Sequence, residues 1–230
     1  MGTKQEQTSV IETPRLERQQ TGRKGSLARR LSGADPLARE MLSVIIPTLD
    51  SERTLVPTLS ALVPGATAGL VSDVLVVDGG SRDETAAVAD VGGCNFLVAE
   101  GSLGQRLKTA VAWARAPWLL FLRPGTILDP SWIGEATHFV ERAAPDTRAA
   151  VFRRAAPAQS TIREALSLVA AALGATPRPE QGLIISKRFY EKIGGHSESA
   201  VEPETDLIHR IGRRRITRLA TSAGLVRQDT

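Results

Sequence analysis

Short unbroken apolar runs recur along this chain from residue 41 onward, and they constrain its fold more than any other feature. The runs are Val44–Ile46, Val74–Val77, Phe96–Val98, Trp118–Leu122, Val151–Phe152 and Leu183–Ile185. A strand with one face in water alternates apolar and polar residues, whereas an unbroken apolar run is typical of a strand that is buried on both faces. The pattern therefore predicts a sheet with helices packed on either side.

Helical spacing of apolar residues lies between several of these runs. One stripe consists of Leu55, Leu59 and Leu62, and others consist of Leu107, Val111 and Ala114, and of Ile162, Leu166, Val169 and Leu173. Apolar residues three and four positions apart lie on one face of a helix. We also expect Ser81 to cap a helix whose first turn holds acidic residues. Strand and helix patterns alternate about six times, which predicts an α/β fold with a mostly parallel sheet.

The domain boundaries follow from a change in composition near residue 41. Residues 1–40 hold eight Lys or Arg against five Asp or Glu and show no sustained apolar period, which predicts a flexible basic leader. An amphipathic membrane-binding helix around Leu27, Leu31 and Leu37 is the alternative. We expect one domain over residues 41–222 and a short tail over residues 223–230.

Composition excludes several classes of protein. The single cysteine, Cys94, rules out an internal disulfide framework and a cysteine-cluster zinc site. No apolar run approaches the roughly 18 residues of a membrane span, and the N-terminus has no apolar signal core, so we expect a cytoplasmic protein. Only 4% of the residues are aromatic, which leaves few platforms for stacking bases and disfavours nucleic acid as a partner.

Polar and glycine residues follow the apolar runs, where an open α/β sheet binds its ligands. Thr48 and Asp50 follow the first run, Asp78-Gly79-Gly80-Ser81 follows the second, and Arg123 follows the fourth. A carboxylate such as that of Asp78 can accept hydrogen bonds from a nucleobase or a ribose, next to glycines that admit a flat ligand. A tight turn in which Asp78 caps its own loop is the alternative.

These motifs together resemble the opening of family 2 glycosyltransferases. The resemblance is carried by residues 42–50, which read LSVIIPTLD, and by residues 76–85, which read VVDGGSRDET. It continues through residues 119–122, 181–195 and 204–207. The closest match is to the small bacterial branch that has Asp-Gly-Gly-Ser in place of the usual Asp-Asp-Gly-Ser. The resemblance covers about residues 42–220.

The resemblance implies a GT-A fold, a Rossmann-like sheet that binds a nucleoside-diphosphate sugar and passes the sugar to an acceptor hydroxyl. Position by position, it places Pro47 and Thr48 in the nucleobase pocket, and Asp50 and Asp78 near the nucleotide. Gly79 stands where many members have a second acid that contacts the base. Arg106 falls in a polar segment close to the sugar donor; a solvated helix face is the alternative for it.

The largest departure from the family follows the fourth apolar run. Members have two acids there, one residue apart, which hold a divalent cation on the sugar diphosphate, but this chain reads Arg123-Pro124-Gly125-Thr126. Mg²⁺ and Mn²⁺ prefer hard oxygen ligands, so we expect weak or no metal dependence and assign no metal ligand. Arg123 can instead grip phosphate oxygens with its guanidinium. A surface arginine in a decayed site is the alternative.

The resemblance also supplies a candidate base. Inverting transfer needs a carboxylate that takes the proton of the acceptor hydroxyl. Glu204 aligns with the family's base and Asp206 with the acid that follows it, although both also suit the N-terminus of a helix. We therefore expect a hexosyltransferase-like enzyme that acts on an unidentified saccharide or lipid-linked acceptor. The alternative is a non-catalytic relative that keeps the fold as a nucleotide-binding or scaffold protein.

A run of basic residues lies near the end of the sequence. It consists of Arg210, Arg213, Arg214, Arg215 and Arg218. Such a run can contact a lipid phosphate or the inner face of a membrane, and a solvated basic face is the alternative.

Overall fold

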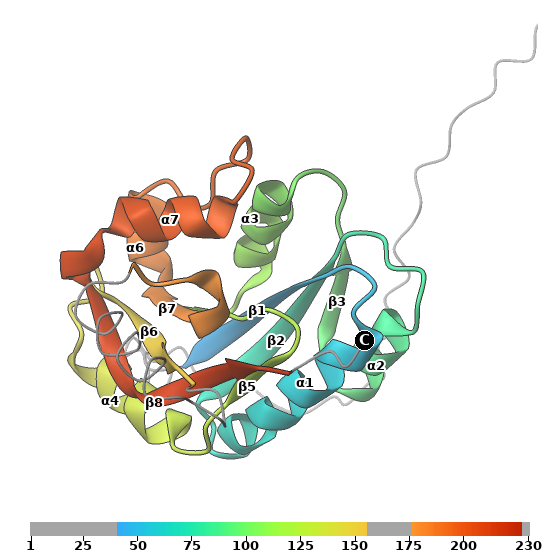
Figure 1. Ribbon diagram of the computed structural model, residues 1–230, viewed down its shortest axis with the longest axis horizontal. Coiled ribbons are helices and arrows are strands. Elements are labelled where there is room, and N and C mark those ends of the chain that lie inside the picture. Colours follow the sequence, from blue (N-terminus) through green and yellow to red (C-terminus); the bar gives the residue numbers. More distant parts are fainter. Residues whose placement is uncertain (1–40, 156–175, 227–230) are drawn as a thin grey trace, which may run out of the picture. The chain divides into compact units, whose positions relative to one another are not determined.

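The computed structural model describes residues 41–155 and 176–226, which build an eight-stranded sheet with helices on both faces (Figure 1). The strands are β1 (Leu42–Thr48), β2 (Val71–Asp78), β3 (Asn95–Val98), β4 (Trp118–Phe121), β5 (Thr126–Leu128), β6 (Ala149–Arg154), β7 (Leu183–Ser186) and β8 (Ile216–Leu225). The helices are α1 (Glu52–Thr67), α2 (Thr85–Val91), α3 (Leu103–Trp113), α4 (Trp132–Arg142), α6 (Lys187–Lys192) and α7 (Pro203–Ile211), with 3-10 turns η2 (Pro179–Gln181) and η3 (Arg213–Arg215).

The sheet has the strand order β3-β2-β1-β4-β7-β6-β8-β5. Strands β3, β2, β1 and β4 run parallel to one another, and β6 runs parallel to β8. Strand β7 is antiparallel to both of its neighbours, and β5 is antiparallel to β8. The predicted α/β class is confirmed, and each of the six apolar runs overlaps a strand. The sheet is parallel throughout its first half and mixed in its second half.

Two strands, β5 and β8, were not predicted from the sequence. Strand β8 alternates exposed and buried positions along most of its length, so it holds no long apolar run. It extends through Leu225, past the domain boundary that we expected at residue 222. The leader of residues 1–40, the helical stripe of residues 162–173 and residues 227–230 lie outside the described residues.

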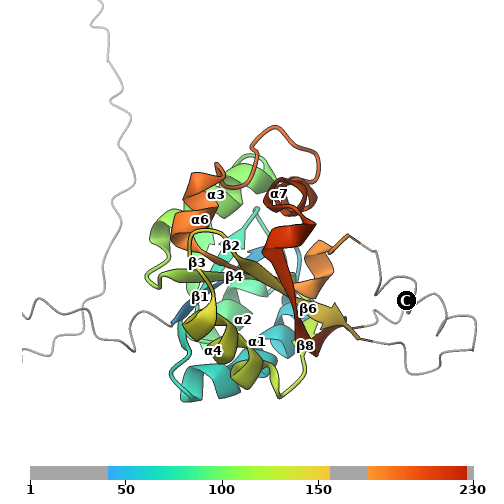
Figure 2. The ribbon, with the colours of Figure 1, turned by 90° about the vertical axis from the view of Figure 1, so that its left-hand side faces the viewer.

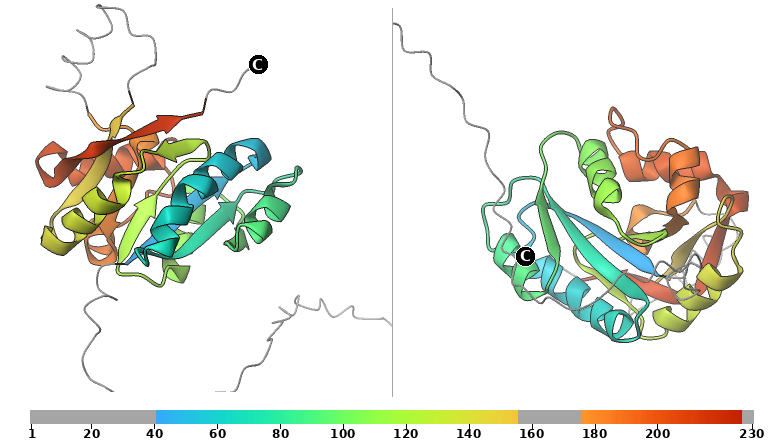
Figure 3. Two further views of the ribbon diagram at one scale, coloured as in Figure 1. Left: turned by 90° about the horizontal axis from the view of Figure 1, so that it is seen from below. Right: turned by 180° about the vertical axis from the view of Figure 1, so that it is seen from behind.

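Helices cover both faces of the sheet (Figures 2 and 3). Two apolar clusters lie under them on opposite faces, which explains the unbroken runs. In β1, Val44 and Ile46 face the cluster under α1, α2 and α4, while Ile45 faces the cluster under α3, α6 and α7. Strand β4 divides in the same way, with Leu120 on the first face and Leu119 on the second. Alternate residues of one run thus fill both cores, because successive side chains point to opposite faces of a strand.

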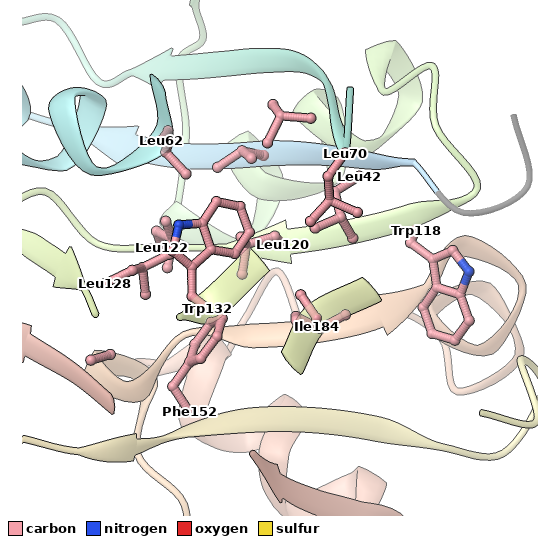
Figure 4. Close-up of a cluster of buried hydrophobic side chains, with 14 of the residues drawn as sticks. Leu42, Leu62, Leu70, Trp118, Leu120, Leu122, Leu128, Trp132, Phe152 and Ile184 are labelled. Carbon is pink, nitrogen blue, oxygen red and sulfur yellow. The ribbon is translucent and has the colours of Figure 1, made fainter. Parts of the chain in front are cut away.

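Trp132 anchors α4 in the first core (Figure 4). Its side chain is 1% exposed, and its indole Nε1 donates a hydrogen bond to the carbonyl of Ala61 at 3.2 Å. A Cβ atom on Gly65 of α1 would approach the indole to 2.4 Å, so the glycine gives the ring its space. Among the described residues, no helix is long and apolar enough to cross a membrane.

Candidate functional site

The strand order reverses at the carboxyl ends of β1 and β4. The chain builds outward from β1 to β2 and β3, then returns to place β4 on the other side of β1. This reversal is a topological switch point, where open α/β sheets bind their ligands. Thr48 at the end of β1 pairs with Asp78 at the end of β2. The pairing of β1 with β4 ends at Ile45 and Phe121, so Arg123 follows β4 by two residues at the same end of the sheet.

The Asp78 carboxylate is saturated by its own surroundings. It is 2% exposed and accepts hydrogen bonds from Thr48 Oγ1 at 2.8 Å, the Gly80 amide at 2.8 Å, the Ser81 amide at 2.7 Å and Ser81 Oγ. Burial acts to raise its pKa, but these hydrogen bonds outweigh burial and hold the pKa below its ordinary value. Both oxygens accept two bonds each, so the geometry matches the locally capped turn and Asp78 shapes the loop.

Asp50 fastens the loop after β1 to the loop after β2. Its amide donates to Ser81 Oγ at 2.8 Å, and its carboxylate accepts a bond from the Arg82 amide at 2.7 Å. Its backbone has φ 47°, a left-handed conformation that aspartate tolerates better than most residues. The side chains of Asp50, Asp78 and Ser81 thus hold the two loops as one unit.

The predicted cap at Ser81 is wrong. Helix α2 begins four residues later, at Thr85, because the Ser81 hydroxyl is already engaged by Asp78 and by the Asp50 amide. Asp83 satisfies the start of the helix instead, since its carboxylate accepts a hydrogen bond from the Thr85 amide at 3.0 Å. Sequence spacing could not separate these two polar residues, which lie two positions apart.

Arg106 reaches from α3 over the ends of β1 and β2. Its Nη1 donates to the Thr48 carbonyl at 3.1 Å, and a Cβ atom on Gly79 would lie only 2.2 Å from that nitrogen. Gly79 therefore makes room for a guanidinium, where the sequence suggested close approach of a flat ligand. Within the described parts of the chain Arg106 contacts no carboxylate, and its Nε is buried without a hydrogen-bond partner. No carboxylate among the described residues therefore neutralises its positive charge at the switch point.

Arg123 is fully compensated by contrast. Its Nε and Nη2 donate to Glu204 Oε2 at 2.9 and 2.6 Å, and its Nη1 donates to Glu180 Oε1 at 3.1 Å. Burial acts to lower the pKa of Arg123, but Glu204, Glu180 and Glu202 together raise it above its ordinary value. We call Arg123, Glu180 and Glu204 the clasp. Glu180 was missed by sequence reasoning, because it lies 57 positions from Arg123 and belongs to no recognisable motif.

The two acids of α7 point in different directions, because residues two apart on a helix do not share a face. Glu204 is 8% exposed and belongs to the clasp. Asp206 lies 2.6 Å from Arg210 Nη2, and Arg210 in turn donates to the carbonyls of Ile193 and Gly195. Asp206 thus supports the turn after α6, and the structure does not bring it together with Glu204.

The residues at the end of β4 do not fit a divalent cation. The guanidinium of Arg123 already lies between the carboxylates of Glu180 and Glu204, and its positive charge repels a metal ion there. Over residues 41–155 and 176–226, no group of three or more His, Cys, Asp or Glu is arranged to hold a metal.

An open cavity of about 440 Å³ lies elsewhere, between α4 and β8. Its lining includes Phe139, Arg142, Arg148 and Leu219, and none of the residues predicted to form the site. The residues predicted to form the site, apart from Asp206, lie instead near the switch point.

The family model described as glycosyl transferase family 2 matches residues 43–197. No curated protein matches the sequence. Among solved structures, glucosyl-3-phosphoglycerate synthase from Mycobacterium tuberculosis in complex with Mg²⁺ and UDP is similar, with a TM-score of 0.62 and 17% identity over 84% of this chain and 73% of that one.

A second structure of the same mycobacterial enzyme contains Mn²⁺, UDP and glucosyl-3-phosphoglycerate. It has a TM-score of 0.61 and 18% identity over 84% of this chain and 74% of that one. At this level of identity the similarity shows a shared GT-A fold, and it confirms the fold expected from the sequence motifs.

Proposed function

Because the chain belongs to glycosyltransferase family 2, we propose that it transfers a sugar from a nucleoside diphosphate to an acceptor hydroxyl. The observation that carries the proposal is the uncompensated guanidinium of Arg106 at the switch point. A diphosphate is the part of the sugar donor with the highest negative charge, and arginine binds phosphate oxygens by charge-assisted hydrogen bonds. The loops that Asp50 and Asp78 hold together lie beside it and would receive the nucleoside.

We propose that the sugar is a hexose, carried on a uridine diphosphate. Support comes from the fold neighbours, one of which was solved with UDP-glucose and Mn²⁺. Pro47 is partly exposed beside Thr48 at the end of β1, so it offers an apolar surface to a base. Thr48 contributes through its carbonyl, which orients Arg106.

Glu204 is the proposed base. In a direct displacement, the acceptor oxygen attacks the anomeric carbon while the bond from that carbon to the diphosphate oxygen breaks. The acceptor proton passes to the Glu204 carboxylate, the nucleoside diphosphate leaves with the electron pair of the broken bond, and the anomeric configuration inverts. The position of Glu204 supports this role, because the side chain lies at the carboxyl edge of the sheet, next to the end of β4.

We further propose that the reaction requires little or no divalent metal. Arg106 offers one positive charge to the departing diphosphate, and Arg123 offers a second where the family's metal ligands would stand. Cations at the departing diphosphate stabilise developing negative charge without a metal ion.

The experiment is a binding and hydrolysis assay with a panel of nucleoside-diphosphate sugars, each with Mn²⁺ and with EDTA. We expect one donor to bind in both conditions and Arg106→Gln to weaken its binding at least tenfold, since a hydrogen bond to a charged group is worth about 1.5–3 kcal/mol. Arg188→Gln is the control, because Arg188 makes an exposed ion pair with Asp146, which is not among the residues of the proposed site. Absence of binding and hydrolysis for every donor would refute the proposal.

A second candidate function is a non-catalytic nucleotide-binding protein. It is favoured by the clasp, in which the proposed base is already ion-paired, and by the saturation of Asp78. A Glu204→Gln variant separates the two functions. An enzyme loses turnover while it keeps its fold and still binds the nucleotide, whereas a binding protein shows no turnover even before the change.

Peripheral contact with a membrane is proposed for the basic turn η3, which would bring the protein to a lipid-linked acceptor. Arg213, Arg214 and Arg215 are all exposed there. Each basic residue near an anionic membrane surface contributes about 1 kcal/mol. Replacing all three by Gln in the full chain should reduce cosedimentation with phosphatidylserine vesicles, and an unchanged bound fraction would exclude this surface.

A further inference from the structure

The clasp presents a conflict that the proposed chemistry must resolve. Glu204 has to accept a proton from the acceptor, yet its Oε2 atom already receives two hydrogen bonds from Arg123. Arg123 has to face the leaving diphosphate, yet three of its N–H groups point to glutamates. While the clasp is closed, these three N–H groups of Arg123 and the Oε2 atom of Glu204 are occupied, so the structure describes a resting state of the site.

The charges of the clasp show which partner can leave. Two carboxylates share one guanidinium, so the group carries a net charge of −1. A diphosphate carries more negative charge than either glutamate and can accept two parallel bonds from one guanidinium. The side chain of Arg123 is 35% exposed, whereas that of Glu204 is 10% exposed, so a ligand reaches Arg123 more readily than Glu204. A bound diphosphate therefore competes with the glutamates for Arg123.

We propose that Arg123 is a counter-ion that the sugar donor displaces from Glu204. In the resting state Arg123 neutralises Glu204 and Glu180. When the donor binds, Arg123 moves to the diphosphate and leaves Glu204 free to act as the base. This inference rests on the proposed function. It assigns a positioning role to Glu180, which touches no reacting atom and holds the guanidinium through Nη1. It also orders the reaction, because the base becomes free only after the donor is in place.

The test exploits Glu180, because its removal loosens the clasp and leaves the base intact. Breaking an ion pair of this exposure changes an equilibrium by about twofold to fivefold, and a fraction of Arg123 trapped by glutamates reduces the apparent affinity for diphosphate by the same factor. We expect Glu180→Gln to bind a nucleoside diphosphate about twofold to fivefold more tightly than the native protein in calorimetry. Glu204→Gln should also tighten binding.

Two further variants separate this role from a structural one. Arg123→Gln should weaken binding, and adding Glu180→Gln to it should have no additional effect, since the clasp no longer exists. Asp146→Asn is the matched control, because it removes the carboxylate of another ion pair, with Arg188, and should not change the affinity. In turnover assays, Glu180→Gln should lower the KM of the sugar donor and leave kcat unchanged.

The outcomes distinguish this inference from the proposed function. The probes are UDP, GDP, ADP, CDP and dTDP, each measured with the full chain. Equal affinities of the native protein, Glu180→Gln and Glu204→Gln for a diphosphate that binds would overturn the inference and leave the proposed function standing. No binding by any variant would overturn both. Diphosphate binding by Glu180→Gln, with no detectable binding by the native protein, would support the proposed role of Arg123 as a counter-ion.

Discussion

Substitution of Gly79 by alanine tests the position of the Arg106 guanidinium with a single added methyl group. The added Cβ atom would lie 2.2 Å from Arg106 Nη1 and 2.8 Å from its Cζ atom. Non-bonded heavy atoms rest at about 3.5 Å, so the guanidinium must withdraw by about 1 Å. That shift stretches its 3.1 Å hydrogen bond to the Thr48 carbonyl beyond bonding distance and removes Arg106 from its position over the strand ends.

The expected magnitudes differ sharply between stability and binding. The φ of Gly79 is not in the left-handed region, so alanine fits the backbone and stabilises the fold by about 0.4–1 kcal/mol through the unfolded state. The lost hydrogen bond costs about 1 kcal/mol, so the free energy of unfolding should change little. The affinity for a nucleoside diphosphate should fall about 10-fold to 100-fold, because a charge-assisted contact is worth about 1.5–3 kcal/mol.

Calorimetric titration with a nucleoside diphosphate, together with thermal unfolding, measures both quantities. Gly134→Ala is the control, because no atom lies within 4 Å of the Cβ position on that glycine of α4. Arg106→Gln should reproduce the loss of affinity, and combining it with Gly79→Ala should add nothing. Native affinity in Gly79→Ala, alongside weak binding by Arg106→Gln, would refute the displacement of Arg106.

Three further predictions concern stability. Burial lowers the pKa of His196 to about 3, so between pH 6.5 and 3 the unfolded chain binds a proton that the folded protein excludes. The free energy of unfolding should therefore fall by up to about 1.4 kcal/mol for each pH unit of acidification in this window. An equally steep loss in His196→Asn would contradict this. Asp78→Ala leaves buried partners unsatisfied and should cost about 2–3 kcal/mol in chemical denaturation. Gly65→Ala should cost about 1–3 kcal/mol by crowding Trp132, and an unchanged midpoint would exclude that contact.

A buried carboxylate illustrates how far a motif can be interpreted. The sequence allowed Asp78 to bind a nucleotide or to cap its own loop, and both functions use the same residues at the same spacing. The structure shows four hydrogen bonds from Thr48, Gly80 and Ser81, which use both carboxylate oxygens. Only the positions of these hydrogen-bond donors in space distinguish the two interpretations.

Arg106 and Arg123 were both expected near the sugar donor, but the structure gives them different environments. Arg123 was expected to face a diphosphate, and Arg106 had a solvated helix face as its alternative. In the structure Arg106 lies at the switch point and pairs with no carboxylate of the described residues, whereas Arg123 pairs with two carboxylates. The partners of Arg123 are 57 and 81 positions away in the chain, so no local pattern reveals them.

The order of apolar runs in the sequence determined the α/β class, its motifs indicated the family, and its polar strand ends predicted the edge of the sheet where we propose that the ligand binds. These properties depend on burial and on neighbours within a few residues, which a single chain displays directly. The tertiary structure alone decided which charges are neutralised, since an ion pair forms wherever folding brings two side chains within about 4 Å, whatever their separation in sequence. It thereby assigned Glu180 to Arg123, separated Asp206 from Glu204, and left Arg106 as the open cation.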